Sequence, residues 1–144
     1  MILALTLTAL LVIVAVVLHL FMLETLQKLL PRLRSPFRVR LGVLILTAIV
    51  GHLLEIGVFA LGISWLAASG EHGQLLGELR EPGFRESYYY SAVTYTSLGF
   101  GDLTPSGNLR LLAAVEALTG LVLITWTASY TFLVMQQFYG QKNR

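Results

Sequence analysis

Two glycines at alternate positions, Gly99 and Gly101, stand in a short segment between two long apolar ones, and Asp102 follows them directly. Glycine adopts left-handed backbone dihedrals readily, so alternate glycines allow successive carbonyl groups to point the same way. At membrane depth such a strand must be buried in protein or must line an aqueous path. Carbonyl oxygens along that path replace the hydration shell of a cation. The spacing therefore indicates cation binding by the backbone.

Three ionisable side chains lie inside apolar segments: His52, Glu55 and Glu116. A charged group at the bilayer centre costs about 2.5–3.5 kcal/mol on insertion scales, so each carboxylate needs a partner or a cavity. His52 and Glu55 are spaced to share one helix face. Three interpretations stay open: a structural polar network behind the carbonyl row, a proton-sensitive switch, and a His/Glu/Glu metal site. The metal site lacks a further ligand, since His72 falls in the outer loop.

The elements that carry these groups are apolar enough for a membrane. Hydrophobic residues make up 56% of the chain and charged residues 12%, which excludes an ordinary water-soluble globule. We expect three transmembrane helices, at 1–30, 41–67 and 109–138. The aromatic segment 84–97 is too short to cross and predicts a re-entrant helix, followed by a loop at 97–102. The predicted fold is an all-α membrane protein.

Charge and residue counts narrow the function further. Ten Lys and Arg against eight Asp and Glu leave a net charge of +2, too weak to suggest a nucleic-acid partner. Cysteine is absent, which excludes disulfides, thiolate metal sites and cysteine nucleophiles. We therefore expect no catalysis and no cofactor.

Basic residues indicate the orientation of the chain. They gather around the loop at 31–40 and in the tail at 140–144, which places both in the cytoplasm. An odd number of spans then puts the N-terminus and the loop at 68–108 outside. The chain is expected to be an integral protein of the plasma, or inner, membrane.

Residues 96–102 read Thr-Ser-Leu-Gly-Phe-Gly-Asp and resemble the potassium-channel signature Thr-Thr-Val-Gly-Tyr-Gly-Asp. Aromatic residues precede this segment, and Thr104 and Pro105 follow it, between two expected spans. The resemblance covers residues 64–139 and is to bacterial pore-loop potassium channels of the two-transmembrane type. Helix 1–30 would be an addition to that minimal pore domain, which here spans 41–139. The resemblance implies a homotetramer with K⁺ as the permeant ion.

The resemblance also assigns roles to individual residues. The filter residues that would bind K⁺ through their carbonyls are Ser97, Leu98, Gly99 and Phe100, with Gly101 completing the filter. A second group is expected to support the filter, and its members are Thr96, Asp102, Tyr89, Tyr90, Glu116, His52 and Glu55. Gly120 falls where such channels keep a gating hinge in the inner helix; close helix packing is the alternative role for it.

Several positions depart from the family signature. Ser97 replaces Thr, and Phe100 replaces the Tyr whose hydroxyl bonds to the pore helix in that family. Leu98 replaces a β-branched residue and is less stiff at χ1. Potassium-selective conduction is the leading function. A weakly selective Na⁺/K⁺ channel and a non-conducting structural or regulatory pore-loop protein are the alternatives.

Asp102 is expected to need a new partner. Val93 stands where some potassium channels carry a pore-helix carboxylate behind the filter. Tyr89 or Tyr90 is expected to supply a hydroxyl in its place.

Overall fold

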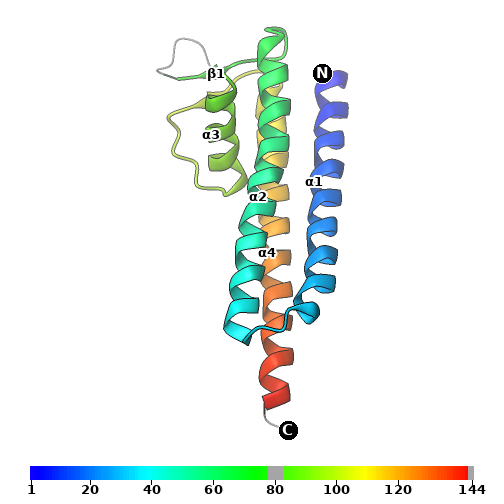
Figure 1. The fold of residues 1–144 in the computed structure, drawn as a ribbon. Helices are drawn as coiled ribbons and strands as arrows, with labels where there is room; N and C mark the ends of the chain where they lie inside the picture. Colours follow the sequence, from blue (N-terminus) through cyan, green and yellow to red (C-terminus); the bar gives the residue numbers. More distant parts are fainter. Residues whose placement is uncertain (78–82, 143–144) are drawn as a thin grey trace.

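The structure, a computed structural model, describes residues 1–77 and 83–142. In this part of the chain three long helices lie side by side (Figure 1). They are α1 (Ile2–Leu29), α2 (Phe37–Ala68) and α4 (Leu109–Lys142), and the 3-10 turn η1 (Leu30–Arg32) follows α1. Each of the three is long and apolar enough to cross a membrane. They confirm the predicted all-α membrane fold.

A shorter helix, α3 (Phe84–Tyr95), packs beside the half of α2 and α4 that lies near the N-terminus of the chain (Figure 1). Glu86 stabilises its start by accepting a hydrogen bond from the Gly83 N–H at 3.0 Å. Two short strands, β1 (Leu75–Leu76) and β2 (Thr104–Pro105), pair antiparallel on either side of α3 in the sequence. This pairing joins the segment before α3 to the segment after residues 97–102, which we call the glycine loop.

The start of α2 differs from the predicted one. The helix begins at Phe37, inside the segment 31–40 that the sequence assigns to a loop. Pro36 caps it with a φ of −53°, and the fixed φ of proline suits the first turn of a helix. Arg38 and Arg40 therefore lie in the first turn of α2, at the end of the helix where the predicted loop adjoins it.

The bounds of α3 and α4 also differ slightly from the predicted ones. Helix α3 ends at Tyr95 rather than at 97, because Ser97 has a φ of +58°, which a right-handed helix cannot contain. Helix α4 continues to Lys142, through most of the predicted tail at 140–144. Residues 143–144 of that tail lie outside the described residues.

Helix α1 packs against α2 and α4 of the same chain through one stripe. Its buried positions recur every three or four residues, at Ala4, Thr8, Leu11, Ala15, His19, Met22 and Leu26, and Leu23 beside Met22 is buried as well. On α2, a Cβ added at Gly62 or Gly51 would overlap the side chains of Leu11 and Met22. Small residues let helices approach closely in membranes, where packing drives their association. The packing therefore gives α1 a fixed place beside α2 and α4.

Candidate functional site

The loop after α3 has a backbone that alternates in hand. The φ angles of Ser97, Gly99 and Gly101 are +58°, +59° and +79°. In the described part of the chain, Ser97 is the one residue other than glycine that has a positive φ. Residues with a Cβ rarely adopt this conformation. The loop thus has the alternating backbone that allows its carbonyls to point one way.

The amide groups of this loop are held by the C-terminal end of α3. The N–H groups of Leu98 and Gly99 donate to the Val93 carbonyl at 2.9 and 3.3 Å, and that of Ser97 donates to the Thr94 carbonyl at 2.9 Å. Among the described residues, no backbone N–H donates to a carbonyl of residues 97–101. The amides of residues 97–99 are therefore bound to α3, whereas the carbonyls of residues 97–101 have no backbone donor among the described residues.

Two side-chain contacts hold the ends of the loop. The Thr96 hydroxyl donates to the Ala92 carbonyl at 2.7 Å, and the Tyr89 hydroxyl donates to Asp102 Oδ2 at 2.8 Å. The hydrogen bond to the Asp102 carboxylate raises the pKa of the Tyr89 hydroxyl. Tyr90 is buried and interacts with Thr94 instead. The structure therefore brings Tyr89, rather than Tyr90, to the outer end of the loop.

A Tyr89→Phe variant is expected to keep its fold and to lose the hold on Asp102. The outer end of the loop then moves more freely, so flux should decline faster during sustained conduction in planar bilayers. Tyr88→Phe is the matched control, because it removes an equivalent hydroxyl that donates to the Leu53 carbonyl at 3.0 Å, away from the loop. An identical decline in both variants would contradict a role of Tyr89 in supporting the loop.

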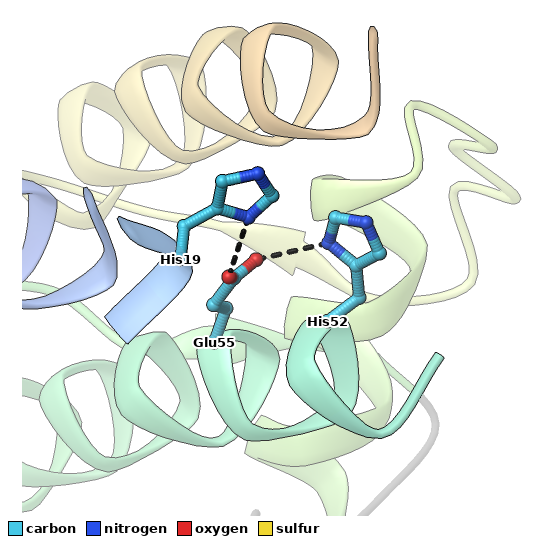
Figure 2. Close-up of side chains that lie close together, drawn as sticks. All are labelled: His19, His52 and Glu55. Atoms are coloured by element: carbon cyan, nitrogen blue, oxygen red, sulfur yellow. Dashed lines mark hydrogen bonds and ion pairs between the residues drawn. The ribbon is translucent and has the colours of Figure 1, made fainter. Parts of the chain in front are cut away.

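Glu55 lies at the centre of a buried polar cluster (Figure 2). Its two carboxylate oxygens accept hydrogen bonds from Nδ1 of His19 and Nδ1 of His52, each at 2.9 Å. The Tyr95 hydroxyl at the end of α3 also donates to Glu55. His19 and Glu55 are fully buried. The cluster therefore joins α1, α2 and α3 just behind the glycine loop.

Glu116 is separate from this cluster. Its carboxyl contacts the Ser91 hydroxyl, which also donates to the Ile56 carbonyl at 2.9 Å. Its second oxygen, Oε2, is buried and has no hydrogen-bond partner in the described part of the chain. Glu116 thus links α4 to the middle of α3. His52 and Glu55 contact α3 through Tyr95, and Glu116 contacts it through Ser91, as expected of a polar network that bonds to this helix. In the described part of the chain, Glu116 does not join His52 and Glu55 in the ligand set that the metal hypothesis requires.

Two members of the Glu55 cluster were missed by sequence reasoning. His19 comes from α1, and Thr127 of α4 places its hydroxyl 3.1 Å from His52 Nε2. The signal for His19 is its position in the regular buried stripe of α1, where a histidine among small and apolar residues requires a polar partner. Thr127 carries no comparable signal, since α4 holds several hydroxyl residues at similar depth.

Gly120 lies where α4 comes closest to the end of α3. A Cβ added at this position would overlap the carbonyl oxygen of Tyr95. Glycine at this place lets the two backbones meet, which is the packing role that the sequence left open. The hinge role stays a prediction.

A Gly120→Ala variant is expected to lower the thermal stability of the purified protein. The added methyl pushes α4 away from Tyr95, and overpacking of this kind costs roughly 1–3 kcal/mol. Gly42→Ala is the matched control, because a Cβ there meets nothing within 4 Å in the same kind of long helix. Thermal unfolding in detergent compares the two. Equal melting temperatures would argue against a packing role for Gly120.

Comparison with known proteins agrees with this geometry. Residues 43–137 match the family model described as "Ion channel". An uncharacterized membrane protein of Bacillus subtilis (strain 168), YdjJ, is 30% identical over 82 residues, which are 56% of this chain and 24% of that protein. The chain thus spans about a quarter of that relative's length. No solved structure matches the chain. Since the family match begins in α2, ends in α4 and encloses both α3 and the glycine loop, the chain belongs to the ion channel family.

Proposed function

We propose that the protein conducts K⁺ passively and selectively through a filter made by residues 97–101. The observation that carries this proposal is the alternating backbone of the loop. The amides of residues 97–99 are bound to α3, while the carbonyls of residues 97–101 accept no backbone hydrogen bond from the described residues. Rings of such carbonyls replace the hydration shell of K⁺. Binding at several successive levels lets ions enter and leave in file.

The exposure of the loop supports a homotetramer. In a single chain all residues from 96 to 102 are exposed. The apolar residues Leu98 and Phe100 are 58% and 65% exposed. Irregular backbone at membrane depth is tolerated only where protein or water covers it. Four chains around one axis supply that cover, and each level of the filter then receives one carbonyl from every chain.

The direction of α3 favours cation binding at the start of the loop. Its C-terminal end, at Tyr95, adjoins the start of the loop. The C-terminus of a helix carries a partial negative charge, which favours a cation close by. In a tetramer four such ends would face the ion path below the filter.

The arrangement of the helix ends supports the proposed orientation. The basic turn η1, the start of α2 and the end of α4 lie at one end of the molecule, while the N-terminus and α3 lie toward the other (Figure 1). By the positive-inside rule the basic end lies on the cytoplasmic side of the inner membrane. The filter then opens on the outer side.

Flux through liposomes tests this function. Purified protein should carry K⁺, Ba²⁺ should block the flux, and reversal potentials with K⁺ and Na⁺ on opposite sides should show a strong preference for K⁺. Equal permeability would overturn the selectivity and favour a weakly selective channel, an alternative that the missing hydroxyl of Phe100 supports. A folded protein that is monomeric or dimeric in detergent, with no flux, would instead favour a non-conducting pore-loop protein.

A further inference from the structure

The Glu55 cluster has a composition that pore support alone does not require. Two imidazoles and one carboxylate from α1 and α2 point toward one another (Figure 2), and their ligand atoms all lie within 4.8 Å of one another. We propose that His19, His52 and Glu55 bind a transition-metal ion of the Zn²⁺ class. This inference does not rest on ion conduction.

The donor set selects the class of metal. Imidazole nitrogen and carboxylate oxygen are ligands of Zn²⁺, and two histidines with one glutamate form a known three-ligand set with an open fourth position. Ca²⁺ and Mg²⁺ prefer oxygen ligands alone. At Zn–N and Zn–O lengths of about 2.0–2.1 Å, neighbouring tetrahedral ligands lie about 3.3 Å apart. The two Nδ1–oxygen distances of 2.9 Å would widen slightly to reach this spacing, and any longer separation, up to the 4.8 Å that bounds the set, would shorten to it.

The hydroxyl of Thr127 supplies a second argument, from a count of hydrogens. It lies 3.1 Å from His52 Nε2 and 3.5 Å from His19 Nε2. Without a metal, both Nδ1 atoms carry the hydrogens that face the carboxylate. In neutral imidazoles both Nε2 atoms are then acceptors, and the single Thr127 hydrogen serves only one of them.

A metal on the two Nδ1 atoms resolves this shortage. Both hydrogens then reside on Nε2, and the two lone pairs of the Thr127 oxygen accept both. A hydrogen bond from the distal ring nitrogen is the usual support of a metal-binding histidine. One extra proton on either imidazole would also give every one of these nitrogen atoms a hydrogen-bond partner. A cluster that holds this proton and no metal is the competing explanation.

Tyr95 provides the fourth position. Its hydroxyl lies 3.0 Å from His52 Nδ1 and donates to Glu55. A hydroxyl that coordinates Zn²⁺ loses its proton more readily. Bound as phenolate, Tyr95 would release one proton to water, and together with the Glu55 carboxylate it would neutralise the ion. The His52 side chain, 18% exposed beside a Glu55 side chain at 1%, marks the accessible edge of the site.

Metal content of the purified protein tests the site. Tag-free protein in detergent is stripped with a chelator, equilibrated with buffered Zn²⁺ and analysed by elemental mass spectrometry. We expect about one zinc per chain in the wild type. His72→Gln should retain it, since His72 lies outside the cluster and bonds to Ser69 at 3.2 Å. His19→Gln and His52→Gln should lose it.

Two further readouts protect the test from misfolded variants. Co²⁺ in the wild type should give the visible absorption of a four-coordinate N/O site, and Zn²⁺ should raise the melting temperature of the wild type and of His72→Gln alone. Zinc that survives His19→Gln would overturn the proposal. Folded wild-type protein without bound zinc or a cobalt spectrum would also overturn it and would leave the added proton as the closure of the cluster.

Discussion

Replacing Gly99 with alanine is expected to remove most K⁺ flux into liposomes that carry the protein. Gly99 has a φ of +59°, and a Cβ there meets nothing within 4 Å, so the backbone conformation rather than a clash causes the effect. A left-handed alanine costs roughly 1–2 kcal/mol in each chain, and about 1.4 kcal/mol is a factor of ten. A ring of four such residues should therefore lower the flux by more than about tenfold.

Gly70→Ala is the matched control for this variant. Gly70 has a φ of +68° and open space around it, so its alanine variant carries the same backbone strain away from the loop. Its flux should stay near that of the wild type. If Gly99→Ala conducts normally, residues 97–101 do not form the filter; if both variants fail equally, the loss reports general strain and not ion binding.

Glu55→Leu should give the largest loss of stability. The change removes the common acceptor of His19, His52 and Tyr95, and leaves their polar groups in an apolar interior. Each buried donor left without an acceptor costs about 1–3 kcal/mol, so the three donors together should lower the stability by several kcal/mol. Denaturant unfolding in detergent, with a chelator present so that no metal contributes, measures this loss.

Glu24→Leu provides the comparison for an exposed carboxylate. The Glu24 side chain is 64% exposed and pairs with Lys28 at 3.4 Å within α1. Exposed pairs of this kind contribute about 0–1 kcal/mol, so this variant should unfold near the wild-type midpoint. Similar midpoints for the two variants would mean that the Glu55 hydrogen bonds contribute little to folding.

The features that the sequence predicts well are those with local causes. The membrane spans follow from apolar length, and the alternating loop follows from two glycines at alternate positions. The sequence also predicts that Tyr89 or Tyr90 bonds to Asp102, and the structure selects Tyr89. The spans and the loop depend on residues that lie close together in the chain, and this pair depends on a short segment that folds back beside α3.

The contacts that the sequence does not predict depend on how the helices align with one another. His19 and Glu55 are 36 residues apart, and only the packing of α1 on α2 decides that they meet. The same holds for Gly120 and Tyr95, whose contact depends on the rotation of α4 against α3. A small axial shift of one helix would replace these partners with others of similar type. Single-sequence periodicity gives the buried face of a helix but not this shift.

The place of His19 outside the family match has a consequence for the evolution of the fold. The matched segment 43–137 contains Glu55 but lacks one of its two imidazole partners. A chain without α1 would therefore keep the Glu55 carboxylate but lose the hydrogen bond that it accepts from His19. Relatives built from two helices alone should then carry an apolar or hydroxyl residue at the equivalent position, whereas those that retain the first helix should inherit both residues together. Positions 19 and 55 thus form a pair by which descent with or without the additional helix can be traced.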